Sequence, residues 1–503
     1  MSDRDLEAAE LAAEETKCEI DLETTKQEST WYSIINVLAL SMGSGMGIPF
    51  SEDDTNEAFG DVGICISDLA NPLPLKAIYK SGDPHLTGNY SDSDFQSWSW
   101  SDDSFDRTLV PQAQSWSIIA ETECAKLFGI QQESWPTSPD TRKDWLSYSL
   151  AVAAEARKQC DFAFDKLRNA QGLFVPSSAE GSVGTDSGNL EDQVSMLWAA
   201  VDVGHLAARS GVFENVDIRD RMHRFSDRLF EIISDNKSML LDNSVNRIQA
   251  QSIAVPALSW YASVTRAQDL RARALWLLRE LADNLVNAQD ANEMVGSTLV
   301  DAASALRALT EAFRVTGLRT YAESAAKIFD YMESQWWKLP GVYAQTPLST
   351  EYTYNADDVA VILGGLNAAR LFLGERINRS LAELRIRLFF CKAVNRSGLQ
   401  MSMPSAELLS MWLGIQKPAS DFRYRTIPLP NAAGGEFGIA PVFAGEISYD
   451  PQGDVWSRNV LFDTQAAMRA SCEFFWINDQ AVNGFPKLML DQAPLEVKKA
   501  AGM

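Results

Sequence analysis

Acidic residues open three of the most apolar helical segments that the sequence predicts. They are Glu191, Asp192, Asp301, Asp357 and Asp358. Two carboxyl groups in different surroundings can work together, one protonated as a general acid and one ionised as a base or nucleophile, as in glycoside cleavage. An acid in the first turn of a helix also stabilises the helix dipole and the unpaired N–H groups without binding anything. Catalysis and helix capping are therefore both open for these residues.

Aromatic residues accompany the acids. Tyr352 and Tyr354 precede Asp357 in STEYTYNADD, and Trp98 and Trp100 lie in a loop rich in Asp and Ser. Flat rings beside carboxylates hold sugars, because the ring covers C–H groups while the acids accept hydrogen bonds from hydroxyls. The same aromatic residues would also serve as wedges between helices. The pattern predicts either a wall for a sugar or small polar ligand, or an aromatic core.

The chain holds only three histidines. His85 lies in GDPHLTGNY, a loop that could reach a binding site, whereas His205 is expected as a packing residue and His223 as a solvated one. No two histidines have the spacing of metal ligands. The acidic loops that begin at Ser51 and Ser91 lack the residue order of an EF-hand. We therefore expect no metal and no cofactor.

A repeat of about 55 residues supplies the elements that would position these side chains. Each copy is a helix that opens on an acid and ends at a glycine (Gly211, Gly317 or Gly374), followed by a second helix, and a copy without its glycine begins at Arg247. Hairpins of this kind cannot bury their apolar faces alone, so neighbours must stack. Apolar helices are expected from 113, 190, 247, 300, 357 and 463, and more polar ones from 143, 217, 267, 318 and 377. Such a set would close into a ring.

Three stretches resemble the six-hairpin (α/α)6 toroid proteins: LEDQVSMLWAAVDVG, STLVDAASALRALTEAFRVTGLRTYAESA and YNADDVAVILGGLNAARLFLG. Over roughly residues 110–480, with the turns QGLF and PGVY, the chain is similar to two groups. These are the helical portion of thioredoxin-like proteins related to spermatogenesis-associated protein 20, and the N-acylglucosamine 2-epimerase group. The resemblance implies a ring whose mouth is lined by the starts of the inner helices, where the five acids would converge. It is a pattern of helix, glycine and helix, so it bears on fold more than on activity.

Two departures from these relatives weaken an inference of activity. No CxxC precedes the helices, and the chain is poor in histidine, whereas the epimerase group is expected to use a histidine pair in its cavity. The fold expected is an all-α (α/α)6 toroid with a loop-rich N-terminal region and an irregular C-terminal insertion. We divide the chain into an acidic arm (1–28), a loop-rich region packed on the ring (29–110), helical hairpins (111–395), and a Gly- and Pro-rich segment with a closing helix (396–503).

Composition excludes several classes of partner. The chain has 44 Lys plus Arg against 68 Asp plus Glu, a formal net charge of −24, which repels nucleic acid and anionic lipid surfaces. Residues 29–51 carry no charge, but Asn36, Pro49 and the glycines between them argue against a membrane span. The acidic N-terminus lacks the basic start of a secretory signal. The six cysteines form no CxxC and are expected as reduced thiols. A cytoplasmic protein is the prediction.

Two functional classes remain open at this point. One is a carbohydrate-active enzyme, a glycosidase or sugar epimerase, in which Asp192, Asp301, Asp357 or Asp358 act as acid and base. The candidate substrate-binding residues would then be Glu191, Tyr352, Tyr354, Trp98, Trp100 and His85. The other is a non-catalytic ring whose acidic surface and irregular segments dock a protein partner.

Overall fold

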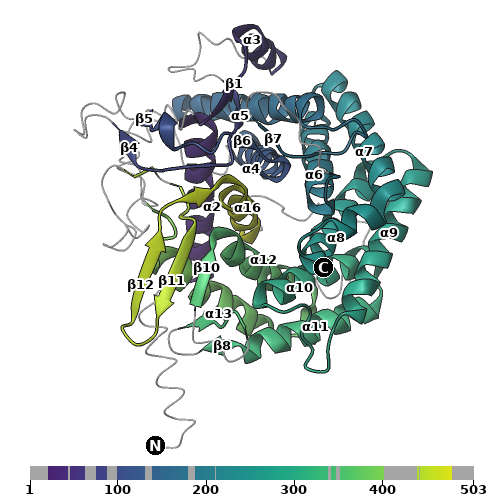
Figure 1. Cartoon of the computed structure of the whole chain (residues 1–503), viewed down its shortest axis with the longest axis vertical. Coiled ribbons are helices and arrows are strands. Elements are labelled where there is room, and N and C mark those ends of the chain that lie inside the picture. The colour runs from purple at the N-terminus through teal and green to yellow at the C-terminus, as the bar shows by residue number, and fades with distance from the viewer. Residues whose placement is uncertain are drawn as a thin grey trace, which may run out of the picture.

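The computed structural model describes residues 21–43, 46–62, 75–87, 99–130, 139–178, 187–209, 211–337, 341–346, 352–401, 439–440 and 442–478. Within these residues, the helices form two concentric layers around one axis (Figure 1). The inner layer is α4 (Pro111–Ile130), α6 (Leu190–Ala207), α8 (Arg247–Val264), α10 (Leu299–Thr316), α12 (Ala356–Phe372) and α16 (Thr464–Ile477). The outer layer is α2 (Leu22–Leu38), α5 (Pro139–Lys166), α7 (Val216–Asp242), α9 (Gln268–Asn287), α11 (Arg319–Ser334) and α13 (Arg379–Phe390).

The inner helices close into a complete ring. Each packs against two inner neighbours, in the order α4, α6, α8, α10, α12, α16 and back to α4. Each also packs against one outer helix, giving the pairs α4–α5, α6–α7, α8–α9, α10–α11, α12–α13 and α16–α2. The predicted (α/α)6 toroid is therefore confirmed, and the starts expected for the inner helices are correct to within two residues.

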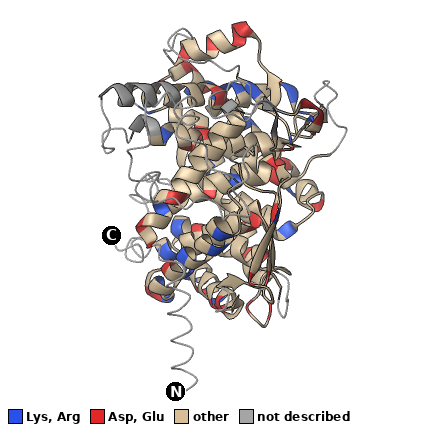
Figure 2. Cartoon of the chain, turned by 90° about the vertical axis from the view of Figure 1, so that its left-hand side faces the viewer, with Lys and Arg blue, Asp and Glu red and all other residues tan. Residues whose placement is uncertain are grey.

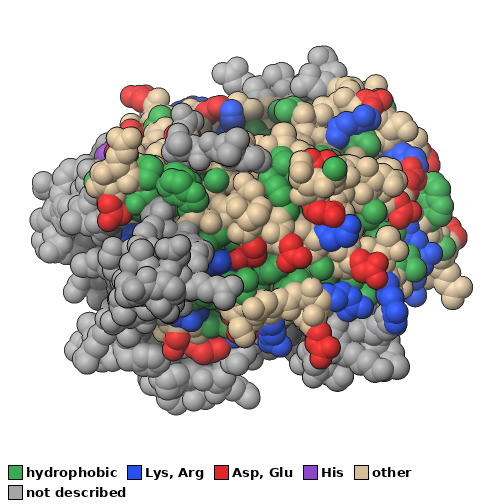
Figure 3. Space-filling model, turned by 90° about the horizontal axis from the view of Figure 1, so that it is seen from below, with side chains coloured by type: hydrophobic (Ala, Val, Ile, Leu, Met, Phe, Trp, Pro, Cys, Tyr) green, Lys and Arg blue, Asp and Glu red, His purple; other side chains and the backbone are tan. Residues whose placement is uncertain are grey.

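Burial explains which helices lie inside. Almost every side chain of α10 and α12 is buried, as the inner layer requires. An outer helix such as α11 is amphipathic and buries one stripe that includes Tyr321, Ala325, Ile328 and Met332. Viewed from below, the outer surface mixes acidic, basic and hydrophobic side chains (Figure 3). The predicted glycine stop at Gly317 is also confirmed: its φ is 70° and its N–H donates to the Phe313 carbonyl at 2.7 Å.

The sixth hairpin joins the two ends of the described chain. Its outer helix is α2, which the sequence analysis did not assign to the ring. Asn36 of α2 donates from Nδ2 to the Ala467 carbonyl at 3.1 Å and to Ser471 Oγ at 2.7 Å. Burial explains why the run after Ser29 carries no charge. Its residues form the second half of α2 and the π-helix η1 (Ala39–Gly43), and both are buried in the core. No helix in the described part of the chain has the length and hydropathy to span a membrane.

Short strands gather where the chain enters the inner helices. β6 (Thr108–Leu109), β10 (Tyr352–Asn355) and β13 (Phe462–Asp463) directly precede α4, α12 and α16, and β7 (Ser177–Ser178) pairs with β6. β10 forms an antiparallel sheet with β11 (Glu446–Asp450) and β12 (Val455–Asn459). Figure 1 shows strands on the side of the ring that faces the viewer. The side view in Figure 2 shows strands along one face of the molecule. In the same view, acidic and basic positions are mixed along the helices. We call the face of the ring with these strands the mouth.

The remaining described elements cover the edge of the ring. They are α3 (Glu52–Asp61), which packs on α5, the 3₁₀-helices η4 (Asp102–Ser104) and η5 (Gly374–Arg376), and the π-helix η6 (Cys391–Arg396). The other strands are β1 (Gly47–Pro49), β2 (Lys76–Ile78), β3 (Ser81–Gly82), β4 (Leu86–Thr87), β5 (Ser99–Trp100), β8 (Trp336–Trp337) and β9 (Val342–Tyr343).

The prediction that all the cysteines are reduced thiols is not met at one described position. Cys124, Cys160 and Cys472 are free and buried. Cys391, at the start of η6, is disulfide-bonded, and its partner lies outside the described residues. The prediction of six reduced thiols was therefore wrong for Cys391. Disulfides persist mainly in oxidising compartments, and the prediction of a cytoplasmic location stays untested.

A reducing agent is expected to lower the melting temperature of the wild-type protein but not that of Cys391→Ser, because the bond constrains the unfolded chain by about 2–4 kcal/mol. Thermal denaturation with and without dithiothreitol measures this. Cys160→Ala, which removes a buried free thiol, should keep the sensitivity to the reductant. Six titratable thiols in the unreduced, denatured protein would contradict the bond.

Candidate functional site

Two of the predicted acids act as helix caps at the mouth. Asp301 forms a capping box with Thr298 at the start of α10. Its Oδ1 also accepts hydrogen bonds from Asn246 Nδ2 at 2.7 Å and Gln249 Nε2 at 3.1 Å, which ties α10 to the start of α8. Asp358 forms the same box with Asn355 at the start of α12, and burial raises its pKa to about 7. Capping accounts for both positions, and a catalytic role for either stays a prediction.

Asp192 lies at the meeting point of three inner helices. Its Oδ1 accepts a hydrogen bond from Gln112 Nε2 of α4 at 3.1 Å, and Gln112 Oε1 in turn accepts one from Gln465 of α16 at 3.0 Å. Burial raises the pKa of Asp192 to about 7. The neighbouring Glu191 instead accepts a hydrogen bond from Ser244 Oγ at 2.5 Å, in the loop between α7 and α8, and burial also raises its pKa.

Asp357 is the predicted acid that contacts a cation. Its Oδ2 pairs with Arg469 Nη1 of α16 at 3.0 Å, across the α12–α16 contact. Its other oxygen, Oδ1, is buried and has no hydrogen-bond partner in the part of the chain that the structure describes. Burial raises the pKa of Asp357, and the Arg469 guanidinium opposes that shift. The acid therefore has a fixed position and one oxygen free to contact a ligand.

A second carboxylate–guanidinium pair lies deeper along the axis. Glu473, one helical turn after Arg469 on α16, forms an ion pair with Arg307 of α10. Both side chains are at least nine-tenths buried. Burial, together with the nearby Arg469, lowers the pKa of Arg307 to about 9. Two ion pairs on adjacent turns of α16 thus connect it to α12 and α10.

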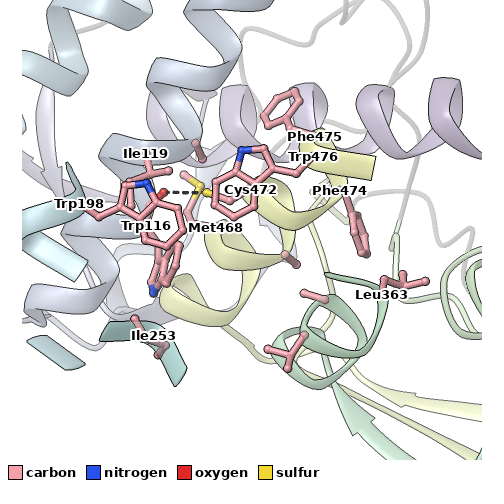
Figure 4. Close-up of a cluster of buried hydrophobic side chains, with 14 of the residues drawn as sticks. Trp116, Ile119, Trp198, Ile253, Leu363, Met468, Cys472, Phe474, Phe475 and Trp476 are labelled. Carbon is pink, nitrogen blue, oxygen red and sulfur yellow. Dashed lines mark hydrogen bonds between the residues drawn. The ribbon is translucent and has the colours of Figure 1, made fainter. Parts of the chain in front are cut away.

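Indole rings enclose these charges. Trp198 of α6 stacks on Trp476 of α16 with ring centroids 5.3 Å apart and planes 6° apart, and Trp116 of α4 meets Trp198 at 5.8 Å. The Arg307 guanidinium lies 4.5 Å from the centre of the Trp476 ring. Arg469 lies 5.3 Å from that of Trp116. Figure 4 shows the three indoles grouped around Met468 and Cys472 of α16. Both cations are therefore held by aromatic faces as well as by carboxylates.

The centre of the ring holds a narrow cavity of about 20 Å³, which we call the axial cavity. A space of this size holds about one water molecule. It is lined by Trp116, Trp198, Ser252, Ile253, Pro256, Ser304, Arg307, Val361, Arg469 and Glu473. None of these lining residues is a histidine.

The sequence analysis missed Arg307, Arg469 and Glu473, which carry most of the charge at the axis. A usable signal was present, because FDTQAAMRASCEFFWI and LVDAASALRALTEAF are otherwise apolar on the faces that carry these residues. Arg469 and Glu473 are also spaced i, i+4, which places both on one face of α16. A charge on the inward face of an inner helix points to the axis rather than to solvent.

The predicted aromatic wall is buried. Tyr354 on β10 is fully buried, and its hydroxyl donates to the Tyr343 carbonyl. Tyr352 packs against Trp337 at 5.4 Å and Tyr449 at 6.2 Å. Stacking a ligand on either ring would require these aromatic neighbours to separate. The binding role of both tyrosines stays a prediction.

The remaining candidates lie in the loop region. Trp98 is outside the described residues, and of Trp100 the structure describes only the backbone, in β5 paired with β4. His85 is about half exposed, and its Nδ1 lies 2.5 Å from Asp83 Oδ1. His205 meets the edge of Trp260 at 4.8 Å, and burial lowers its pKa to about 3, consistent with a packing role. No group of three or more described His, Cys, Asp or Glu side chains is arranged to hold a metal ion.

Gly364→Ala is expected to lower the free energy of unfolding by about 1–3 kcal/mol, the range for overpacking a core. A β-carbon at this position of α12 would come within 2.9 Å of Glu473 Cδ, and Glu473 is held in its ion pair. Urea denaturation measures the change. Gly60→Ala is the matched control, because a β-carbon there would meet nothing within 4 Å. Equal stabilities of the two variants would contradict the packing of the ion pair against α12.

No protein-family model and no curated protein matches the chain. Solved structures do match. A D-mannose isomerase aligns with a TM-score of 0.50 and 9% identity over 85% of this chain and 97% of that chain. The chain shares its toroidal fold. A sugar epimerase from a ruminal bacterium (0.47, 11% identity, 83% and 98% covered) and cellobiose 2-epimerase from Bacillus thermoamylovorans B4167 (0.48, 12%, 84% and 99%) also align. At these identities the likeness concerns the fold alone.

Proposed function

We propose that the chain is a carbohydrate-active toroid protein that binds a sugar at the mouth of the ring and acts on it by proton transfer. The reaction would be sugar epimerisation or isomerisation, or glycoside hydrolysis. The observation that carries the proposal is the pair of carboxylates on the axis, Asp357 and Glu473, each held by an arginine from another helix and enclosed by indoles. Carboxylates, guanidinium donors and aromatic faces together suit a polyhydroxy ligand.

The two carboxylates have different surroundings, as acid–base chemistry requires. Glu473 is fully paired with Arg307, which favours its ionised form and the role of base. Asp357 has a pKa raised by burial and one unpartnered oxygen, which favours the role of acid. Asp192, with its pKa raised to about 7, is the second candidate acid because it reaches α16 through Gln112 and Gln465.

Under this proposal the sugar would lie above the axial cavity rather than inside it, because the cavity is too small. The cavity has room for about one water molecule, whereas a small-molecule site usually encloses about 300–1,000 Å³. A sugar would therefore lie towards the helix starts, in reach of Asp357, and would contact Glu473 only if Arg469 turned aside. Under this proposal Arg469 contacts the ligand and also controls access to Glu473.

A panel of monosaccharides and disaccharides tests the proposal, with thermal stabilisation as the readout for binding and NMR in D₂O as the readout for turnover. For a substrate found in this way, Asp357→Asn and Glu473→Gln should each lower kcat by about 10²–10⁴, the range for a general acid or base. Asp217→Asn is the control, since Asp217 also opens a helix but lies exposed on outer helix α7. Unchanged turnover in both axial variants would overturn the assignment.

A non-catalytic docking protein is the second candidate, and two observations favour it. The axial cavity is lined by ion pairs and indoles and has a volume of only about 20 Å³. On the outer layer, Trp276 of α9 is 62% exposed beside Lys237, as interface residues often are. If no sugar in the panel raises the melting temperature and Glu473→Gln changes stability alone, the docking function replaces the enzymatic one.

A further inference from the structure

Four buried polar groups around the axial cavity have no hydrogen-bond partner among the described residues. They are Trp116 Nε1, Ser252 Oγ, Ser304 Oγ and Arg469 Nε. They come from four different helices, α4, α8, α10 and α16, and their residues are only 1%, 4%, 4% and 6% exposed. Buried polar groups are almost always hydrogen-bonded. Four of them around one small space point to an occupant that satisfies them together.

The unpartnered groups require an occupant that accepts hydrogen bonds. The indole and guanidinium nitrogens can only donate, and the two serine hydroxyls can donate as well as accept. Figure 4 shows the indole nitrogen of Trp116 on the side of Ile253, another residue that lines the cavity. Arg469 lies over the face of the same indole at 5.3 Å, so the two nitrogen donors belong to neighbouring side chains of the lining. The carboxylate in the lining, Glu473, is already paired with Arg307.

Charge and size restrict the occupant further. Two guanidiniums, those of Arg307 and Arg469, line the cavity against one carboxylate, that of Glu473, while the carboxylate that pairs with Arg469, Asp357, lies outside the lining. A space of about 20 Å³ accepts a single heavy atom and excludes sulfate or phosphate. A water molecule would also fit, because it could accept from Trp116 Nε1 and Arg469 Nε and donate to the two serine hydroxyls, so charge and not hydrogen bonding distinguishes the two occupants. A monatomic anion accepts from all four groups at once.

We propose that the axial cavity is a halide site that holds chloride, with Trp116, Ser252, Ser304 and Arg469 as its ligands. The anion would lie below the proposed sugar and would fix Arg469 between Trp116 and Asp357. The site is independent of any activity on sugars, because its ligands and its volume are set by the packing of the inner helices. Its test therefore gives the same answer whether or not the protein is an enzyme.

Anomalous diffraction from crystals grown in chloride and transferred to bromide tests the site directly. The expected result is a bromide peak in the cavity within about 3.5 Å of Trp116 Nε1 and Arg469 Nε, the outer limit of a hydrogen bond to such a donor. Density for a water molecule without anomalous signal would overturn the proposal. So would bromide peaks confined to the protein surface, which would mark adventitious ions only.

Binding in solution gives a second measurement. Bromide should quench the fluorescence of the buried tryptophans in a saturable manner, and chloride should compete, whereas gluconate at the same ionic strength should do neither. Ser304→Ala removes one donor without changing charge and should weaken halide binding about 10- to 100-fold, as expected for one hydrogen bond to a charged acceptor. Ser226→Ala is the control, because Ser226 is a buried serine on outer helix α7 that donates to the Met222 carbonyl. Equal halide affinity in both variants would contradict the assignment of Ser304.

Discussion

Replacing Arg307 with methionine is expected to lower the free energy of unfolding by about 3–5 kcal/mol, the range for removing one partner of a buried ion pair. The cause is the Glu473 carboxylate, which is only 2% exposed and would remain at the ring axis without its cation. Arg307 also lies on the faces of Trp476 and Trp198, at 4.5 and 5.8 Å, so packing is lost with the charge. Urea denaturation with the wild type alongside measures the difference.

A double variant separates the unpaired charge from the lost packing. Arg307→Met combined with Glu473→Met should recover most of the lost stability, because replacing a whole buried pair by apolar side chains is often neutral. Arg228→Met is the control: its pair with Glu231 is on the surface, with side chains 70% and 40% exposed, and should contribute less than about 1 kcal/mol. Similar losses from Arg307→Met and Arg228→Met would show that the axial charges are solvated.

Glu28→Gln is expected to remove a loss of stability that the wild type shows as the pH rises from 5 to 8. Glu28 of α2 is buried, accepts a hydrogen bond from Asn395 Nδ2 at 2.8 Å, and has one unpartnered oxygen. Burial raises its pKa from the ordinary 4.5 to about 7. Between these values the unfolded chain releases the proton while the folded protein keeps it, so a rise in pH favours unfolding.

The size of this effect follows from the pKa difference of about 2.5, which corresponds to about 3 kcal/mol once the pH exceeds 7. Glutamine cannot ionise but keeps the acceptor for Asn395. The difference in unfolding free energy between variant and wild type should therefore grow with pH, and other titrating groups such as His205 cancel from it. Ser29→Ala, which changes a buried side chain of the same helix that does not titrate, should show a flat difference. A flat difference for Glu28→Gln would place that carboxylate in solvent.

The sequence predicts the ring well because its repeat carries physical information. In several copies an acid lies at the helix start and a glycine lies at or shortly after its end, as Asp301 and Gly317 show for α10. The sixth outer helix, α2, could not be predicted in this way. Its partner is more than 400 residues away, and α2 is buried almost all round, so neither the period nor an amphipathic stripe identifies it.

The candidate site is less predictable, since a sequence does not say which way a charged helical residue points. Asp357 was identified, and the structure places it against Arg469. Asp301 and Asp358 have the same residue type in the same helical position, yet their carboxylates turn back to the caps. Only the direction of each side chain separates the two outcomes, and tertiary packing decides that direction.

The pairing of α2 with α16 has a consequence for how the polypeptide matures on the ribosome. The hydrogen bond from Asn36 to Ser471 cannot form until Ser471 has been added to the chain, 435 residues later. At about 5–20 residues per second, the delay is roughly 20–90 s. During that time α2, which carries the buried Trp31, Ile34 and Ile35, lacks its main partner helix. The nascent chain is thus exposed to aggregation until α16 has been synthesised, and we expect its yield in cells to depend on chaperones that cover α2 until then.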